Sequence, residues 1–413
     1  MSITPPRPLW SGRTLALIGI LLVAANLRTA VAALSPIVGV INADIPLAAT
    51  AIGLLGMLPP VCFAVFGVFT PVFTRRLGLE NVLLLALVAM LAGHITRGLA
   101  GSLGVLVLGS VITFAGLGVG NVLLPPLVKK YFPDRIGLVT SLYVTVVSLS
   151  TLIPPLIAVP VADAAGWRVS LGLWFVLALI ALVPWMAMFV RHRVETSATA
   201  PIEEAEPAMI GQIWRSPIAW ALAVVFATSS LNAYAMFAWL PQILVDTAGV
   251  TPAGAGTLLS MYAAMGIPCA LLIPWLTARM KNVAVLVYVG ALAFLIGDLG
   301  LLLAPATLTW LWALLAGLGP LLFPLALVLI NLRTRTHAGS VALSGFVQSV
   351  GYTLGALGPI SVSLLHEFTG TWTAPIAFLI ATALAVTAAA AVIARPHMLE
   401  DDLHRRHTSR AVS

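Results

Sequence analysis

The stretch that decides the fold is LALIGILLVAANLRTAVAALSPIVGVI, residues 15–41. An α-helix rises about 1.5 Å per residue, so this run can cross a hydrocarbon layer roughly 30 Å thick. Arg28 lies near its middle and cannot lose its charge. A guanidinium at that depth is unfavourable by about 3 to 10 kcal/mol or more. Because the run contains no acidic residue, we expect Arg28 to face a polar cavity within a helical bundle.

The composition extends this pattern to the whole chain. Of 413 residues, 60% are hydrophobic and only 8% are charged, whereas soluble domains are about 25% charged. Charge and turn clusters divide the chain into twelve apolar spans, near 14–41, 50–73, 81–100, 103–128, 137–162, 169–190, 216–245, 253–277, 283–304, 308–331, 338–366 and 373–394. We therefore predict an all-α polytopic membrane protein with twelve transmembrane helices in the lipid bilayer.

The basic residues indicate the topology. Every Lys and Arg except Arg28, Arg97 and Arg168 falls in one set of alternate loops or at the termini. The opposite loops carry Asp44, Asp163, Asp246 and Glu367. The positive-inside rule then predicts a multi-pass plasma-membrane protein with both termini in the cytoplasm. The net charge of +7 is explained by this topology, and we do not expect a nucleic-acid partner.

The chain divides into two similar halves. A polar segment at 191–215 predicts a cytoplasmic linker between a first six-helix bundle at 1–190 and a second at 216–394, with a cytoplasmic tail at 395–413. Gly93-His94 and Gly297-Asp298 correspond at an offset of about 204 residues, as Gly56-Met57 and Ser260-Met261 do. Because each half has an even number of spans, the repeats share one orientation.

Motifs in five spans carry a family resemblance. They are Asn26-Leu-Arg28 with Ser35-Pro36, Gly116-Leu-Gly118-Val-Gly120 with Pro125, Lys129 and Lys130, Ala238-Trp239-Leu240-Pro241, Gly317-Leu-Gly319 with Phe323-Pro324, and Phe346-Val-Gln348 with Gly351. The chain resembles the cyanate/2-nitroimidazole transporter branch of the major facilitator superfamily. The resemblance implies two pseudo-symmetric six-helix bundles, a central cavity, alternating access and a small polar or anionic solute. One departure is the loop at 75–80, which lacks the acidic residue of the superfamily's Asp-Arg-x-Gly-Arg-Arg motif.

The resemblance also assigns spans 1, 4, 7 and 10 to the cavity, with 2, 5, 8 and 11 beside it. The polar residues on these spans give the candidate solute site: Arg28, Asn26, Asn121, Tyr143, Ser148, Asn232, Tyr234, Tyr262, Gln348 and Tyr352. Arg28 is the predicted anion anchor, because its donor fork suits an oxyanion. The alternative is a structural arginine bonded to carbonyls or to Asn121. Asn26 does not share the face of Arg28, and the tyrosines are also candidates for helix packing.

Two titratable residues within predicted spans are candidates for energy coupling. Asp298 and His94 occupy equivalent positions in the repeat, and an intramembrane carboxylate is a default candidate for proton transfer. Both lie on spans that the resemblance places at the periphery, so a structural role competes with coupling. Proton co-transport, exchange and downhill flux all remain open.

These observations predict a secondary transporter of a small anion or compact polar solute, cyanate-like or nitroimidazole-like. The alternative of the same fold is a drug or xenobiotic exporter in which Arg28 is structural. A passive channel and a membrane enzyme are competitors from other classes. We expect no enzyme activity and no cofactor, because the chain has no Walker loop and no metal-ligand spacing within a span. Cys62 and Cys269 are predicted to be small buried hydrophobes, and a monomer suffices for the fold.

Overall fold

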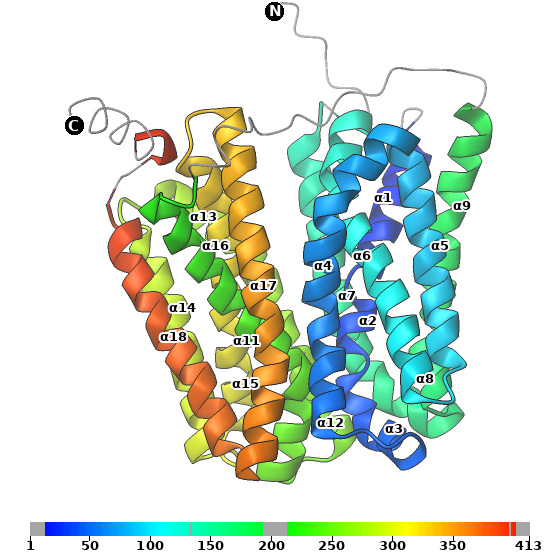
Figure 1. The fold of residues 1–413 in the computed structure, drawn as a ribbon, viewed down its shortest axis with the longest axis vertical. Helices are drawn as coiled ribbons and strands as arrows, with labels where there is room; N and C mark the ends of the chain where they lie inside the picture. Colours follow the sequence, from blue (N-terminus) through cyan, green and yellow to red (C-terminus); the bar gives the residue numbers. More distant parts are fainter. Residues whose placement is uncertain (1–12, 133, 193–212, 396–397, 402–413) are drawn as a thin grey trace, which may run out of the picture. The chain divides into compact units, whose positions relative to one another are not determined.

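The computed structural model describes residues 13–132, 134–192, 213–395 and 398–401. These residues form helices and, within those ranges, no strand (Figure 1). Eleven segments of the described chain are long and apolar enough to cross a membrane. The predicted eleventh span corresponds to a further 33-residue helix, α17, which is richer in Gly, Ser and Gln. The predicted all-α membrane fold is confirmed, while most of the predicted linker and tail lie outside the described residues.

Contacts divide the chain into two units, Met1–Leu47 with Cys62–Ile202 and Ala48–Val61 with Glu203–Ser413. The boundary after Ile202 falls within the predicted linker, but residues 48–61 differ from the predicted domain 1–190. Residues 48–61 belong to unit 2 because they pack closely against other residues of that unit. A Cβ on Gly53 would lie 2.6 Å from Ser363 Cβ, and a Cβ on Gly56 would lie 2.7 Å from Ala238 Cβ.

Unit 1 is built around its first, broken span. Its elements are α1 (Thr14–Asn26), α2 (Thr29–Ala32), η1 (Ser35–Ile37), α3 (Val38–Asp44), the later part of α4 (Ala49–Leu77), α5 (Leu79–Gly98), α6 (Leu103–Tyr131), α7 (Ile136–Ala165), α8 (Trp167–Gly172) and α9 (Phe175–His192). Helix α1 packs against α6, α7 and α9, and α5 packs against α6, α8 and α9. The first span is therefore surrounded by helices of its own unit.

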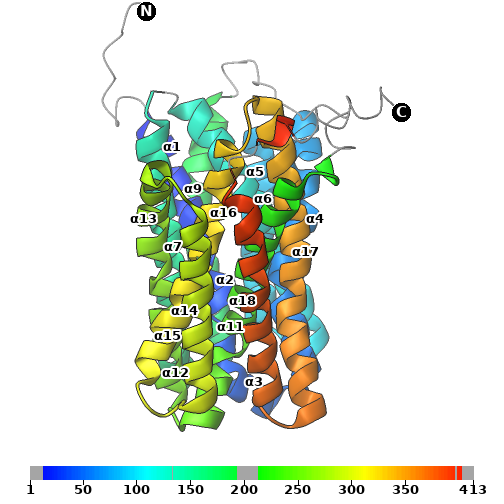
Figure 2. The same cartoon turned by 90° about the vertical axis from the view of Figure 1, so that its left-hand side faces the viewer.

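Unit 2 has the corresponding arrangement. Its elements are α11 (Pro217–Ala248), α12 (Pro252–Ala264), α13 (Gly266–Arg279), α14 (Ala284–Leu303), α15 (Thr309–Leu318), η2 (Gly319–Leu321), α16 (Leu322–Leu332), α17 (His337–Thr369) and α18 (Thr373–Ile393). Helix α11 packs against α12, α16, α17 and α18, and α14 packs against α15 and α18 (Figure 2).

The two longest helices of unit 2 have well-defined ends. Ser216 caps α11 by accepting the Ala219 N–H, Pro217 occupies the first helical position, and Gly249 ends the helix at φ 65°. Thr336 caps α17 by accepting the Gly339 N–H at 3.0 Å, and Gly370 ends it at φ 65°. Polar N-caps and a left-handed glycine satisfy end groups that a membrane helix otherwise leaves unpaired.

Prolines set the breaks within spans. A proline clashes with the carbonyl four residues earlier and removes one helical hydrogen bond. Pro36 stands four residues after Ala32, where α2 ends, and Pro268 four residues after Ala264, where α12 ends. Pro320 lies within η2, which separates α15 from α16. Spans one, eight and ten are therefore discontinuous near a proline, whereas Pro125 in α6, Pro241 in α11 and Pro359 in α17 lie within unbroken helices.

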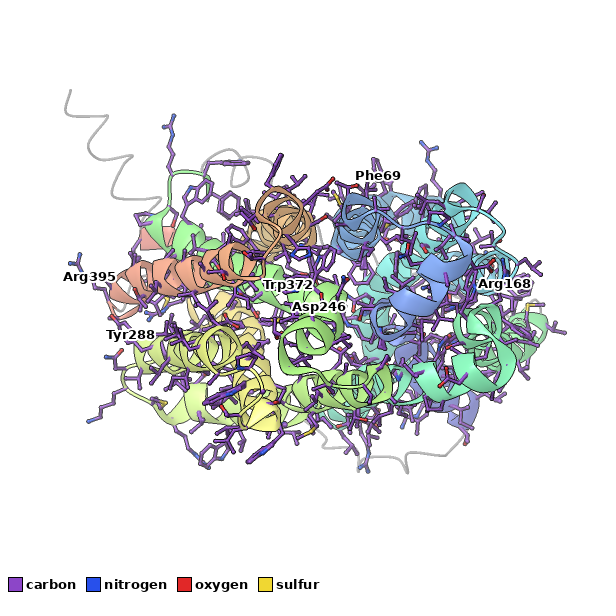
Figure 3. The ribbon with its side chains drawn as sticks, turned by 90° about the horizontal axis from the view of Figure 1, so that it is seen from below. Phe69, Arg168, Asp246, Tyr288, Trp372 and Arg395 are labelled. Carbon is purple, nitrogen blue, oxygen red and sulfur yellow. The ribbon has the colours of Figure 1, made fainter. Side chains whose placement is uncertain are left out.

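The internal repeat is visible in individual contacts of each unit. The Cys62 thiol donates to the Val111 carbonyl at 4.0 Å in unit 1, and the Cys269 thiol to the Leu318 carbonyl at 3.9 Å in unit 2. Both cysteines are free and buried. At one end of each unit a Trp indole donates to a carboxylate, Trp167 to Asp44 at 3.1 Å and Trp372 to Asp246 at 3.0 Å (Figure 3). The halves thus repeat tertiary contacts as well as residues.

Candidate functional site

Arg28 lies at the first break of span one, directly before α2. The Thr29 hydroxyl donates to the Asn26 carbonyl at 3.0 Å, and the Val31 N–H donates to the Arg28 carbonyl at 3.2 Å. The break is therefore stabilised locally, which satisfies backbone groups that could not stay unpaired at this depth. The Arg28 side chain is half-buried. Discontinuous membrane helices form the substrate sites of many secondary transporters.

An aromatic ring faces the Arg28 guanidinium. Arg28 Cζ lies 5.4 Å from the centroid of the Phe63 ring on α4, within the range of a cation–π interaction. Helix α6 closes on this pair through small residues, because a Cβ on Gly118 would lie 3.2 Å from Phe63 Cα and one on Gly120 would lie 3.3 Å from Leu27 Cδ2. Sequence reasoning missed Phe63, since one phenylalanine among 15 carries no polar signal.

The acidic residue closest to Arg28 in the sequence is engaged elsewhere. Asp44 Oδ2 accepts from Arg168 Nη1 at 2.6 Å and from the Trp167 indole at 3.1 Å. Arg168 also donates to the Ala100 carbonyl at 2.9 Å. This group joins the end of span one to α8 (Figure 3). Asp44 therefore stabilises the end of unit 1.

Several other predicted site residues keep partial exposure. In unit 1, Asn121, Tyr143 and Ser148 are half-buried, and the Ser148 hydroxyl donates to the Val144 carbonyl at 3.1 Å. In unit 2, Gln348 is half-buried and donates to the Ser344 hydroxyl at 2.7 Å on its own helix. Partial exposure suits a residue that contacts solute, and their role in binding stays a prediction.

Two predicted tyrosines of unit 2 are packed more deeply. Tyr234 and Tyr352 are 7% and 5% exposed. The Tyr352 ring meets the Phe226 ring edge-on, with centroids 5.0 Å apart, and Phe226 also packs on Phe323 at 5.1 Å. These aromatic contacts join α11, α16 and α17. They favour a packing role for Tyr352 over direct contact with a solute.

Asn26 and Asn232 face outer helices of their own units. The Asn26 amide donates to the Leu22 and Leu177 carbonyls at 2.8 and 3.3 Å, which joins α1 to α9. The Asn232 amide donates to the Thr228 carbonyl and the Thr382 hydroxyl, both at 2.9 Å, which joins α11 to α18. Both asparagines are fully buried. The repeat thus preserves an interhelical hydrogen bond, and this placement favours a structural role.

We expect Asn232→Ala to lower the free energy of unfolding by about 1 kcal/mol, because interhelical hydrogen bonds in membranes contribute about that much. Solute affinity should stay within a factor of about two, since the amide points to α18. Thermal unfolding and equilibrium binding of the purified variant measure both. Asn81→Ala is the control, because Asn81 is exposed and bonds only the Leu77 carbonyl, at 2.7 Å. A large loss of affinity without loss of stability would return Asn232 to the solute site.

The coupling candidate of unit 2 is a fully buried carboxylate. Asp298 on α14 is 0% exposed, and neither carboxylate oxygen has a hydrogen-bond partner among the described residues. Tyr262 on α12 is 2% exposed, and its hydroxyl is likewise without a partner within that part of the chain. The Tyr262 ring meets Phe237 of α11 edge-on at 5.6 Å. Tyr262, predicted as a solute contact, is therefore packed against α11 and interacts electrostatically with Asp298.

The corresponding position of unit 1 carries basic groups. His94 is fully buried on α5, and neither of its ring nitrogens has a hydrogen-bond partner among the described residues. One turn further, Arg97 is 1% exposed, donates to the Ala30 carbonyl at 3.4 Å and lies 5.9 Å from the Phe114 ring centroid. It also lies in the last turn of α5, where the helix dipole favours a cation. These contacts favour a structural role for Arg97, and the coupling role of His94 stays a prediction.

The stretch at 75–80, which departs from the superfamily's Asp-Arg-x-Gly-Arg-Arg motif, takes part in ion pairing in unit 1. Glu80, the last residue of that stretch, forms an ion pair with Lys130 and accepts from the Tyr131 hydroxyl at 2.8 Å. Nearby, Arg13 donates to Asp134 at 2.5 and 3.1 Å and to the Tyr131 carbonyl at 3.1 Å. The ends of α1, α5 and α6 are therefore joined by charge pairs within unit 1.

The Arg13–Asp134 pair predicts a pH dependence. Hydrogen bonds from Arg13 lower the pKa of Asp134 from 3.8 to about 2. Because the folded pKa is below the unfolded one, the pair stabilises the protein above about pH 4, and this stability is lost as pH falls toward 2. We expect the Tm of Arg13→Gln to fall less steeply over that window than the wild-type Tm. Lys281→Gln, at an exposed position, should match wild type, and equal slopes for all three would contradict the pairing.

A carboxylate also caps the loop before α17. Glu400 Oε1 accepts from the Arg335 and Thr336 N–H groups at 2.9 and 3.0 Å and from the Thr336 hydroxyl at 3.1 Å. Burial raises the pKa of Glu400, but these hydrogen bonds outweigh it and the net pKa is lowered. Arg335 pairs with Asp401 at 2.6 Å. The segment 398–401 is therefore fastened to the N-terminus of α17.

The arrangement defines a class of protein. Two repeated units of membrane-length helices, with discontinuous spans and a charged residue at a break, are characteristic of secondary transporters. The Major Facilitator Superfamily profile matches residues 17–359. The chain belongs to this superfamily, and it is a transporter rather than an enzyme.

Relatives confirm the branch that the motifs indicate. The chain is 36% identical over 375 residues to an uncharacterized transporter of Bacillus subtilis, covering 90% of this chain and 91% of the relative. It is 31% identical to the 2-nitroimidazole transporter of Escherichia coli, covering 88% and 91%. It is 23% identical to the cyanate transport protein of the same organism, covering 86% and 91%.

A solved structure supports the fold. A bacterial homolog of the human lysosomal transporter Spinster superposes with a TM-score of 0.70, covering 94% of this chain and 96% of that protein. The two sequences are only 14% identical. This likeness therefore concerns the fold alone, and it agrees with the major facilitator architecture inferred from the repeats.

Proposed function

We propose that this protein is a secondary transporter of a small anion or compact polar solute, with Arg28 as the anchor. The observation that carries this proposal is the half-buried guanidinium on the break of span one, facing the Phe63 ring at 5.4 Å. A guanidinium offers a planar fork of donors that fits two oxygen atoms of one group. At low dielectric such charge-assisted hydrogen bonds are stronger than in water.

The proposed solute is compact and π-delocalised. Relatives at 31% and 23% identity are named for 2-nitroimidazole and cyanate. Both compounds carry electron density on terminal atoms that can accept from Arg28. The nitroimidazole ring can also pack on a phenylalanine face, as aromatic pairs do. Arg28 and Phe63 together would thus recognise the polar and the planar parts of one solute.

The proposed transport cycle follows from the class. Solute binding at Arg28 would be followed by alternating access to the two sides of the plasma membrane. We propose that both termini are cytoplasmic, because basic residues concentrate on their side of the chain. A monomer suffices for this cycle, and a proton is the proposed co-transported ion.

A second candidate is an exporter of larger aromatic compounds, in which Arg28 is structural. The observation that favours it is a relative of Acinetobacter baumannii, 31% identical over 164 residues (38% of this chain), that is named as a quinolone resistance transporter. Bulky apolar solutes are bound through area and shape. In this case small anions would not bind.

Ligand-induced stabilisation of the wild-type protein tests the proposal. Purified protein in detergent is heated with cyanate, 2-nitroimidazole or a cationic drug. A ligand at 100 times its Kd should stabilise the native state by about 2.7 kcal/mol. Stabilisation by cyanate or 2-nitroimidazole supports the anchor. Stabilisation by the cationic drug alone supports the exporter, and solute counterflow in vesicles excludes a passive channel.

A further inference from the structure

Asp298 is a buried carboxylic acid in the interior of unit 2. Asp298 is fully buried, and neither carboxylate oxygen has a hydrogen-bond partner among the described residues. An ionised carboxylate with no donor in an apolar interior is strongly unfavourable. The arrangement seen here therefore suits the neutral acid, and the ionised form requires a different one.

The helices around Asp298 offer no counter-charge. Helix α14 packs against α15, η2, α16 and α18. None of these four elements contains Asp, Glu, Lys, Arg, His, Cys or Tyr. The other titratable residue of α14 is Tyr288, which is exposed (Figure 3). The titratable group that interacts electrostatically with Asp298 is Tyr262 on α12.

Tyr262 stands beside a helix break. Helix α12 ends at Ala264, two residues later, because of Pro268. Helix α15 touches the Tyr262 backbone, since a Cβ on Gly317 would lie 2.4 Å from the Tyr262 carbonyl oxygen. The Tyr262 ring also meets Phe237 of α11. A change in the charge of Asp298 therefore acts on a residue whose side chain contacts α11, whose backbone contacts α15, and which lies two residues before the end of α12.

We propose that Asp298 is a proton-binding site, and that proton release is coupled to a rearrangement of Tyr262 at the break after α12. This inference rests on the proposed function as a solute transporter and supplies its coupling ion. It makes Tyr262 a positioning residue for the proton site. The sequence had placed Tyr262 among the solute contacts.

The proton step exchanges one proton with water. Asp298 as the neutral acid transfers its proton to a water molecule, which leaves a carboxylate with one negative charge and a hydronium ion. That carboxylate needs a donor, and the Tyr262 hydroxyl, which interacts electrostatically with Asp298, is a buried donor without a partner within the described chain. Reorientation of Tyr262 towards the carboxylate would supply this donor and would act on the break that follows α12. Uptake of a proton reverses both changes.

Infrared difference spectroscopy tests the proton site without any solute. The purified protein in lipid nanodiscs is titrated from acid to alkaline pH. We expect a protonated-carboxyl C=O band that titrates, is lost in Asp298→Asn and is shifted in Tyr262→Phe. Asp246→Asn is the control, because that carboxylate accepts from Trp372 at the end of unit 2. A band unaffected by Asp298→Asn, or one that does not change with pH, would overturn the proposal.

Vesicle transport then links the site to function. With a pH dye inside and 2-nitroimidazole or cyanate as the probe, wild type should move protons with solute. Asp298→Asn should exchange solute across the membrane yet lose at least about nine-tenths of the proton flux. Undiminished proton flux in this variant overturns the proposal while the transporter assignment stands. If neither probe is carried by wild type, the proposed solute class fails, and the infrared band still decides the role of Asp298.

Discussion

Replacing Arg28 by alanine is expected to weaken binding of cyanate or 2-nitroimidazole by roughly 10- to 100-fold. The reason is that a hydrogen bond to a charged group contributes about 1.5–3 kcal/mol, and each 1.4 kcal/mol is tenfold in affinity. The fold should persist, because the break around Arg28 is stabilised by backbone groups and by the Thr29 hydroxyl. Equilibrium binding and thermal unfolding of the same preparation measure the two effects separately.

Two further variants define what Arg28 contributes. Arg28→Lys keeps the charge but loses the planar fork, so its affinity should fall between wild type and Arg28→Ala. Phe63→Leu keeps the apolar volume but removes the ring, so it should weaken 2-nitroimidazole more than cyanate. An unchanged Kd in Arg28→Ala would contradict the anchor and favour the structural arginine of the exporter alternative.

Adding one methyl group at Gly297 is expected to destabilise unit 2 by about 3 kcal/mol or more. A Cβ there would lie 2.4 Å from the Ala316 backbone nitrogen and 2.8 Å from Ala316 Cα. The obstacle is backbone, so α14 and α15 would have to separate, and overpacking of this kind ranges from about 1 to 3 kcal/mol and occasionally more. The Tm of Gly297→Ala measured in detergent should fall clearly below that of wild type.

The matched control is Gly345→Ala on α17, because no heavy atom lies within 4 Å of a Cβ built there. Alanine is favoured over glycine within a helix by about 1 kcal/mol, so this variant should be at least as stable as wild type. The repeat adds a second test, since a Cβ on Gly93 would meet Thr113 Oγ1 at 2.2 Å. A Gly297→Ala protein with wild-type stability would mean that α14 and α15 are not in close contact.

The sequence predicts most of the fold because bilayer physics leaves few choices. Apolar runs of membrane length must form helices, since no other local structure satisfies the backbone in lipid. Proline positions do not settle where spans are broken, because Pro36 and Pro268 lie at breaks whereas Pro241 lies within a continuous helix. The equivalence of Gly93 and Gly297 predicts a pair of contacts that the structure shows, one in each unit. The assignment of residues 48–61 was beyond such reasoning, because a contact between helices depends on side chains far apart in the sequence.

The candidate site was predictable only in part. Polarity within an apolar span singles out Arg28, Asn232 and Asp298 equally. It does not show that Asn232 bonds Thr382 on an outer helix or that Asp298 has Tyr262 as its neighbour. Phe63 gave no signal at all, because its importance lies in facing Arg28. The rotation of each helix about its own axis decides these partners.

What the sequence by itself determined is the class, a repeated all-α transporter with a charge within its first apolar span. It did so because the bilayer limits both the length of an apolar span and the number of charges within it, and both can be read directly from the sequence. Only the tertiary structure decided which polar residues face a helix and which remain half-exposed. Asn26 donates a hydrogen bond to α9, whereas Arg28, only two residues later in the sequence, faces the Phe63 ring. Hydrogen bonds and ring contacts are short-ranged, so they are set by how neighbouring helices are rotated and how closely they approach.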